Sequence, residues 1–138
     1  MIGILIISHG TLGESLIHCA SHVLNKRPPR LRQLGVTAQD DPTLLLPQAR
    51  SLIKELDDGS GVLILTDMFG GTPSNLAAKL VVPGKVEAVA GVSLPMVIRV
   101  LTYRDRDLQT IVTKAISGGC EGVIRVPMLK LHNAATGN

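Results

Sequence analysis

The stretch GILIISHGTLGESL, residues 3–16, decides the fold, because an apolar run ends there in a histidine and a polar helix start follows. Residues 2–7 are apolar without alternation, so the stretch 2–8 is typical of a strand that is buried on both faces. Thr11 followed by Glu14 matches a capping box, so we expect a helix to begin at Thr11. In this helix, apolar side chains recur at helical spacing and predict one buried stripe: Leu12, Leu16, Ala20, Val23 and Leu24.

The alternation of strand and helix continues along the whole chain. Further strands are expected at 31–36, 61–67, 86–93 and 122–129, and helical patterns cover about 44–56, 72–80, 95–103 and 107–117. This order predicts an α/β fold with a doubly wound, mostly parallel sheet and right-handed crossovers. Ligands of such sheets bind beyond the carboxyl ends of the strands, where the strand order reverses. The two loops of interest at that edge are 8–11 and 66–75.

Three local patterns predict helix ends. Thr72 is expected as an N-cap and Pro73 as the first helical residue after it. Pro47 falls in the first turn of the helix expected from residue 44. The pair Gly118-Gly119 is interpreted as a C-cap that ends the last helix.

Length and composition indicate one domain over residues 1–130, followed by a flexible tail over 131–138. The chain has 138 residues, of which 45% are hydrophobic but only 1% aromatic, so the core is expected to consist of aliphatic side chains. The apolar run at 2–7 is too short for a membrane span. Cys19 and Cys120 lie far apart without a CxxC motif, so a disulfide framework and a zinc site are disfavoured, and a cytoplasmic protein is expected. Cys19 is interpreted as a packing residue.

The basic segment, residues 26–32 (KRPPRLR), is the one dense cluster of charge in a chain of net charge +3. A solvated loop and an edge for an acidic partner are both compatible with it. No aromatic residue is interleaved with these charges, so the stacking that single-stranded nucleic acids need is unsupported, and no nucleic-acid partner is expected.

The two loops at the predicted carboxyl edge carry groups suited to phosphoryl transfer. Neither a P-loop nor a G-x-G-x-x-G motif is present, which disfavours ATP and dinucleotide chemistry. A neutral His9 whose ring is oriented by Asp67 could attack a phosphoryl group and form phosphohistidine. Gly70 and Gly71 would bring backbone N–H groups, with the start of a helix, close to phosphate oxygens, and Thr72 could add a hydroxyl. This arrangement assumes that the strands ahead of His9 and Asp67 are neighbours in the sheet.

The other histidines are weaker candidates. His18 and His22 are four residues apart, so they could share a metal ion, but no carboxylate or thiol obviously joins them. We interpret both as exposed surface residues. His132 lies in the predicted tail.

Three motifs together resemble a known family. ILIISHGTLGESL (4–16), GVLILTDMFGGTPSNLA (61–77) and VAGVSLPMVIRVL (89–101) resemble the mannose-type IIA domain of the bacterial phosphoenolpyruvate-dependent sugar phosphotransferase system, over nearly the whole chain. The resemblance implies that His9 takes a phosphoryl group from the carrier HPr and passes it to a IIB protein or domain for sugar uptake. It places the orienting carboxylate on Asp67, the phosphate-side hydroxyl on Thr72, and the glycine pair on Gly70 and Gly71.

The resemblance also implies an assembly and a set of partners. The family fold has four parallel strands and a further antiparallel strand, here 122–129, that is exchanged between the subunits of a homodimer. No metal or organic cofactor is implied, and contact with a membrane would be indirect, through a permease complex. Family members often carry tryptophan at Phe69 and a bulky apolar residue at Ser74, so the partner-facing surface is expected to differ here. The sugar is not identified.

Two other functions stay open. The chain could be a stand-alone regulatory phosphocarrier without sugar transport. Some tetrapyrrole chelatases also begin with a strand that runs into a His-Gly turn, but they need a second metal-binding side chain and a roomy apolar cleft. A histidine phosphatase or mutase is less favoured, because no arginine lies beside His9 in the sequence.

Overall fold

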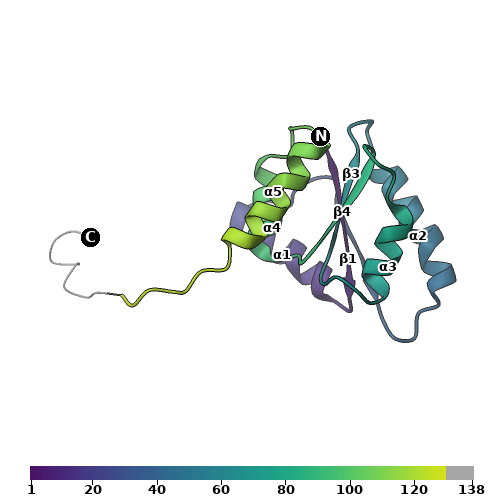
Figure 1. Ribbon diagram of the computed structural model, residues 1–138, viewed down its shortest axis with the longest axis horizontal. Coiled ribbons are helices and arrows are strands. Elements are labelled where there is room, and N and C mark those ends of the chain that lie inside the picture. The colour runs from purple at the N-terminus through teal and green to yellow at the C-terminus, as the bar shows by residue number, and fades with distance from the viewer. Residues whose placement is uncertain (130–138) are drawn as a thin grey trace.

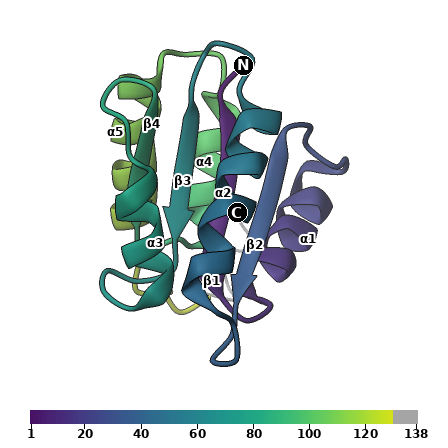
Figure 2. The ribbon, with the colours of Figure 1, turned by 90° about the vertical axis from the view of Figure 1, so that its right-hand side faces the viewer.

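A four-stranded sheet lies between two layers of helices in the computed structural model, which describes residues 1–129 (Figure 1). The strands run parallel in the order β2-β1-β3-β4, and the α/β class with a parallel sheet is therefore confirmed (Figure 2). The strands are β1 (Gly3–His9), β2 (Leu31–Val36), β3 (Val62–Thr66) and β4 (Val86–Ala90). The helices are α1 (Leu12–Leu24), α2 (Pro42–Leu56), α3 (Thr72–Leu80), α4 (Leu94–Thr102) and α5 (Leu108–Glu121).

Aliphatic side chains of the two central strands fill a core on each face of the sheet. Ile4, Ile6, Leu63 and Leu65 pack against α1, α4 and α5, whereas Leu5, Ile7 and Ile64 pack against α2 and α3 (Figure 1). Because successive side chains of a strand point to opposite faces, both faces of β1 must be apolar, as the unbroken run in its sequence indicates.

The switch point of the sheet lies between β1 and β3. After β1 the chain turns to α1 on one face, and after β3 it turns to α3 on the other face. The two strands pair in parallel, with Ile7 opposite Thr66, so their carboxyl ends lie side by side. This is the place at which doubly wound sheets bind ligands.

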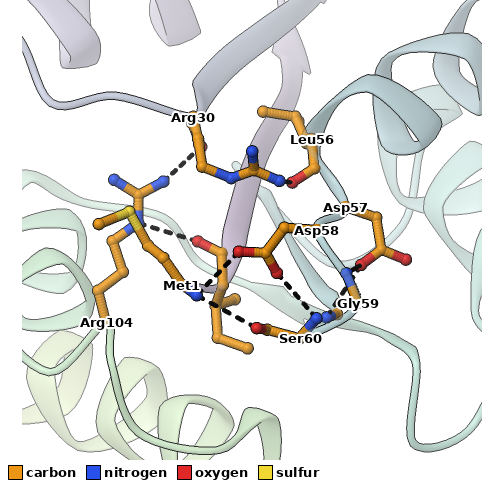
Figure 3. A network of polar contacts seen from close by, with 10 residues as sticks. Met1, Arg30, Leu56, Asp57, Asp58, Gly59, Ser60 and Arg104 are labelled. Atoms are coloured by element: carbon orange, nitrogen blue, oxygen red, sulfur yellow. Dashed lines mark hydrogen bonds and ion pairs between the residues drawn. The ribbon is translucent and has the colours of Figure 1, made fainter.

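Arg104, which follows α4, ties the amino ends of the strands together (Figure 3). Its guanidinium donates one hydrogen bond to the carbonyl oxygen of Ile2, at 2.9 Å, and another to the carbonyl oxygen of Arg30. Arg30 in turn donates to the carbonyl oxygen of Leu56. Burial of Arg104, together with the nearby charge of Arg30, lowers the pKa of Arg104 to about 10. The side chain therefore stays charged at neutral pH and links β1, β2 and the loop after α4.

The predicted starts of three helices differ in detail from the observed ones. Thr11 precedes α1 as expected, but its side chain makes no capping hydrogen bond, so the capping box is wrong. Helix α3 begins at Thr72 itself, with Gly71 in the cap position, because the chain reaches the helix through a residue at φ +87°. Helix α2 begins at Pro42, two residues before the predicted start, because the Asp41 carboxylate caps it by accepting from the Thr43 N–H at 2.9 Å.

The buried stripe of α1 is shifted from the predicted one. Leu16 and Ala20 are buried as expected, but Leu12 and Val23 are 41% and 56% exposed. The sheet-facing side of the helix also includes Gly13 and Ile17, so the stripe turns around the helix by about one residue. Cys19 lies on the exposed side, and its interpretation as a packing residue is wrong.

Gly118 and Gly119 do not end α5, which continues to Glu121. A Cβ atom at Gly118 would lie 2.7 Å from the Cβ of Arg99, and one at Gly119 would lie 2.9 Å from the Cε of Met96. The two glycines therefore let α5 approach α4 closely, and packing rather than capping explains them.

Residues 123–129 leave α5 as an exposed segment that projects away from the sheet (Figure 1). In the single chain no strand forms at 122–129, since a strand needs a hydrogen-bonded neighbour and none lies beside this part of the described chain. The predicted tail at 131–138 lies outside the described residues. Within residues 1–129, no helix has both the length and the apolar character needed to cross a bilayer.

Candidate functional site

His9 and Asp67 meet at the switch point. His9 is the last residue of β1, and Asp67 directly follows β3. The His9 Nδ1 lies 2.8 Å from the Asp67 Oδ2, and the same oxygen accepts the main-chain N–H of His9 at 3.0 Å. The Asp67 Oδ1 accepts the N–H of Met68 at 3.1 Å. The neighbouring strands that the sequence analysis assumed are therefore present, and the carboxylate holds both the ring and the backbone of His9.

The environment of Asp67 favours its charged form. Burial by itself would raise the pKa of Asp67, but the hydrogen bonds from the backbone and ring of His9 outweigh it and hold the pKa below its usual value. An ionised carboxylate can only accept hydrogen bonds, so the His9 Nδ1 carries the proton. In the neutral ring the lone pair is then on Nε2. The His9 side chain is 52% exposed and that of Asp67 14%, so the imidazole is accessible while its partner is not.

Gly71 lies on the Nε2 side of the His9 ring, and Gly70 precedes it in the chain. Gly71 has φ +87°, and a Cβ atom there would lie 3.6 Å from both Nε2 and Cε1 of His9. Gly70 also has a positive φ, +93°, and a Cβ atom there would meet nothing within 4 Å. Helix α3 starts directly after this pair, so the positive end of its dipole lies near the imidazole. The region beside Nε2 of His9 is therefore free of side chains on the Gly71 side, and it lies near the positive end of the α3 dipole.

Thr72 is the first residue of α3 and is exposed. Among residues 1–129 its hydroxyl makes no hydrogen bond to another protein group, which leaves it available to a ligand beside Gly71. Thr72 also lines a groove of about 240 Å³ between α2 and α3, together with Pro42, Asn75 and Lys79. The structure thus brings Asp67 and Gly71 next to the His9 ring, and Gly70 and Thr72 adjoin Gly71 in the chain.

Two features of this edge, its exposed apolar side chains and the burial of Ser8, were not predicted from the sequence. Met68 and Leu12 are exposed apolar residues near His9 in the chain or next to its partner Asp67, with exposed fractions of 56% and 41%. Phe69, known from the family resemblance, is 89% exposed. Ser8 is fully buried under the turn, on the opposite face from His9. A polar residue at the end of an apolar strand was the only signal for it.

The other histidines take no part in this site. His18 and His22 are exposed on α1, and His132 lies outside the described residues. Among residues 1–129, no group of three or more His, Cys, Asp or Glu side chains is arranged to hold a metal ion. A cavity of about 520 Å³ lies along α4 and includes none of the residues around His9.

The fold and the site together define an α/β protein with a polar site at the switch point of a doubly wound sheet, centred on an accessible histidine. The family model described as "PTS system fructose IIA component" (EIIA-man) matches residues 3–116. The chain therefore belongs to the EIIA-man family of sugar phosphotransferase system components, as its motifs indicate.

Two relatives illustrate this membership. The chain is 31% identical over 137 residues to the PTS system mannose-specific EIIAB component of Escherichia coli K12, covering 97% of this chain and 42% of that protein. It is 28% identical over 106 residues to the PTS system fructose-specific EIIA component of Bacillus subtilis, covering 76% of this chain and 72% of that protein. The chain thus spans less than half the length of the E. coli relative.

Solved structures share the fold. A mannose/sorbose-specific IIA subunit from Enterococcus faecalis superposes with a TM-score of 0.83 at 21% identity, covering 94% of this chain and 97% of that one. A phosphotransferase system component EIIA from Streptococcus agalactiae gives 0.80 at 22% identity, covering 91% and 97%. The sheet order and the helix layers are therefore those of this family.

Proposed function

We propose that this chain is a phosphocarrier of a sugar phosphotransferase system, in which His9 accepts a phosphoryl group from phosphorylated HPr and passes it to a IIB protein or domain. The observation that carries the proposal is the 2.8 Å pair between His9 Nδ1 and Asp67, which leaves the opposite ring nitrogen accessible beside Gly71. Family membership supports a role in phosphoryl transfer. The curated relatives support a sugar phosphotransferase system as its setting.

The transfer needs no cofactor. The lone pair on the His9 Nε2 attacks the phosphorus of the donor phosphohistidine, a new P–N bond forms, and the P–N bond to the donor breaks, which returns the electron pair to the donor nitrogen. The Nδ1 proton stays between the ring and Asp67. As the new bond forms, the imidazole gains positive charge, and its hydrogen bond to the carboxylate strengthens. The second transfer, to the IIB acceptor, is the same step in reverse.

The phosphoryl oxygens would lie against the start of α3. The transition state of phosphoryl transfer is loose and carries negative charge on its equatorial oxygens, so it is stabilised mainly by positioning and by hydrogen-bond donors. Gly70 and Gly71 expose backbone without side chains, and the helix dipole adds partial positive charge. The hydroxyl of Thr72 can donate a further hydrogen bond.

The proposal is tested by intact mass spectrometry of the full chain after incubation with phosphoenolpyruvate, the first enzyme of the system and HPr. The wild type should gain one acid-labile phosphoryl group, which should then be lost on addition of a IIB acceptor. His9→Gln should gain none. His18→Gln, at an exposed histidine of α1, is the matched control and should be modified like the wild type. Labelling of His9→Gln would refute the assignment of the acceptor.

The proposal includes a homodimer in which residues 122–129 pair with the partner subunit. Among the described strands β4 pairs only with β3, apart from a single bridge at its first residue, and the exposed segment carries Val123, Ile124 and Val126 without cover. Pairing would satisfy the free edge and bury these side chains. Sedimentation of the full chain should show a dimer, and Ile124→Asp should shift it towards the monomer while Arg125→Gln does not. A monomeric wild type would refute this part alone.

Contact with a membrane would be indirect, through a permease complex. The proposal names no sugar, because the names of the relatives specify mannose in one case and fructose in another.

A further inference from the structure

A second polar cavity lies between α1 and β2, apart from the His9 site. It has a volume of about 310 Å³ and is lined by Glu14, Ile17, Arg27, Arg32 and Gln33. Four of these five side chains are polar, so the cavity is suited to a small hydrophilic molecule rather than to an apolar one. None of the five belongs to the residues that surround the His9 ring.

Two arginines of the basic segment, Arg27 and Arg32, line this cavity. Among residues 1–129, the guanidinium of Arg27 makes no ion pair and no hydrogen bond. Arg32 pairs with Glu55 at 2.7 Å, but both side chains are about half exposed, and such surface pairs contribute little to stability. Glu55 belongs to α2, so the guanidinium of Arg32 lies on the α2 side of β2 and has to leave this pair to reach an anion in the cavity. Arg27 thus offers one guanidinium group, and Arg32 adds a second when it leaves Glu55; together they match a phosphate group, which accepts several hydrogen bonds from arginine.

Glu14 and Gln33, the other polar residues of the cavity, limit which groups the ligand can carry besides phosphate. Glu14 pairs with no cation among residues 1–129, and its carboxylate repels a second anionic group but accepts hydrogen bonds from hydroxyls. The Gln33 side-chain oxygen is buried and lacks a hydrogen-bond partner in the described chain, as does the buried hydroxyl of Ser8. Both oxygens adjoin Gly13, since a Cβ atom there would lie 3.1 Å from the Ser8 Oγ and 3.2 Å from the Gln33 Oε1. One end of the Gln33 amide is thus enclosed, and its other end is left for the cavity.

We propose that this cavity binds a small phosphate monoester that carries hydroxyl groups, of the kind a phosphorylated sugar or polyol provides. Arg27 and Arg32 hold the phosphate, while Glu14 and Gln33 bind the hydroxyls. Through Gln33, Gly13 and Ser8 the cavity adjoins the residue before His9, so a ligand bound there would lie against the base of the phosphoryl-transfer site. The binding itself does not require that site to be active.

Binding can be measured by titrating the unphosphorylated full chain with glycerol 3-phosphate and following backbone amide resonances. Saturable shifts are expected at Glu14, Ile17 and Gln33. Arg27→Gln should weaken the affinity by at least about tenfold, because it removes charge-assisted hydrogen bonds. Arg50→Gln removes an exposed arginine of α2 and should leave the affinity unchanged.

Separate arms of the titration identify the chemistry. Inorganic phosphate should bind more weakly than glycerol 3-phosphate, and glycerol should not bind. Equal affinity for inorganic phosphate would overturn the assignment of the hydroxyl groups. The absence of saturable shifts, unchanged binding by Arg27→Gln, or shifts confined to Gly70 and Gly71 would overturn the site itself. Because none of these readouts depends on phosphohistidine, failure here is distinct from failure of the phosphocarrier proposal.

Discussion

Replacing Asp67 by asparagine tests whether the carboxylate assists the chemistry or merely completes the turn. In the wild type one carboxylate oxygen accepts hydrogen bonds from both the ring and the main chain of His9, at 2.8 and 3.0 Å. An asparagine oxygen can take the same place, but as a neutral acceptor. Hydrogen bonds to charged groups contribute about 1.5–3 kcal/mol and neutral ones about 0.5–1.5, so the loss is about 1–2 kcal/mol.

That loss applies to the transition state, in which the imidazole carries more positive charge than before the attack. A difference of about 1–2 kcal/mol corresponds to a transfer rate about 5- to 30-fold lower for Asp67→Asn. Asp67→Ala removes the acceptor altogether, and its rate should fall further, by about 10- to 150-fold. The order wild type, Asp67→Asn, Asp67→Ala is therefore expected for the rate constant of phosphorylation by phosphorylated HPr.

Quenched-flow sampling with mass detection measures this rate constant under single-turnover conditions. The matched control is Asp105→Asn, which removes the same charge from an exposed aspartate in the loop between α4 and α5. It should leave the rate unchanged. If Asp67→Asn reacts within about twofold of the wild type, the carboxylate does not stabilise the developing charge and the reasoning from its geometry is wrong.

Three further outcomes are expected. The pKa of Asp67 is lower in the folded state than its ordinary value near 3.9, so the ionised carboxylate stabilises the fold at a pH above that value. The free energy by which the wild type exceeds Asp67→Asn in urea unfolding should therefore shrink as the pH falls below about 3.9. Gly71→Ala and Gly70→Ala should each lose about 1–2 kcal/mol from strain at positive φ, but only Gly71→Ala, whose Cβ faces the His9 ring, should also slow phosphorylation strongly. Arg104→Ala should cost about 2–4 kcal/mol, because it removes the guanidinium hydrogen bonds to the carbonyl oxygens of Ile2 and Arg30. The exposed Arg106→Ala should change the free energy of unfolding by less than about 0.5 kcal/mol.

The central strands and the site pair could be predicted because local patterns suffice for them. The runs before His9 and Asp67 are apolar without alternation. Such a run buries all of its side chains only in a strand that is covered on both faces. A polar residue at the end of each run then falls at the edge where ligands of parallel sheets bind. The adjacency of β1 and β3 could not be derived in this way, because strand order depends on crossovers that periodicity does not encode.

Helix ends were predicted less well, because the same residue types serve different purposes. Gly118 and Gly119 have the composition of a C-cap, but they exist where α5 lies close to Arg99 and Met96 of α4, a contact between segments some twenty residues apart. Thr72 has the composition of an N-cap, but Gly71 takes that position. Segment 122–129 reads as a strand in sequence, yet a strand also needs a neighbour, and the single chain provides none among its described residues.

Arg104 and the cavity beside Gln33 were also beyond the reach of sequence patterns. An arginine in a polar loop is ordinarily solvated, and nothing local indicates that Arg104 reaches the main chain at Ile2 and Arg30. The basic segment is evident in the sequence, but that it lies beside Glu14 follows only from the packing of α1 on β2.

The pairing of β1 with β3 makes competence for the reaction a property of the finished fold. His9 and Asp67 stand 58 positions apart in the chain, and an entire helix–strand–helix excursion must be completed before they can touch. In a nascent chain that contains only β1, α1 and β2, His9 lacks the Asp67 carboxylate that orients its ring. Under the proposed function, a chain that lacks β3 should therefore take up phosphate from the donor more slowly than the folded protein, as expected for Asp67→Ala.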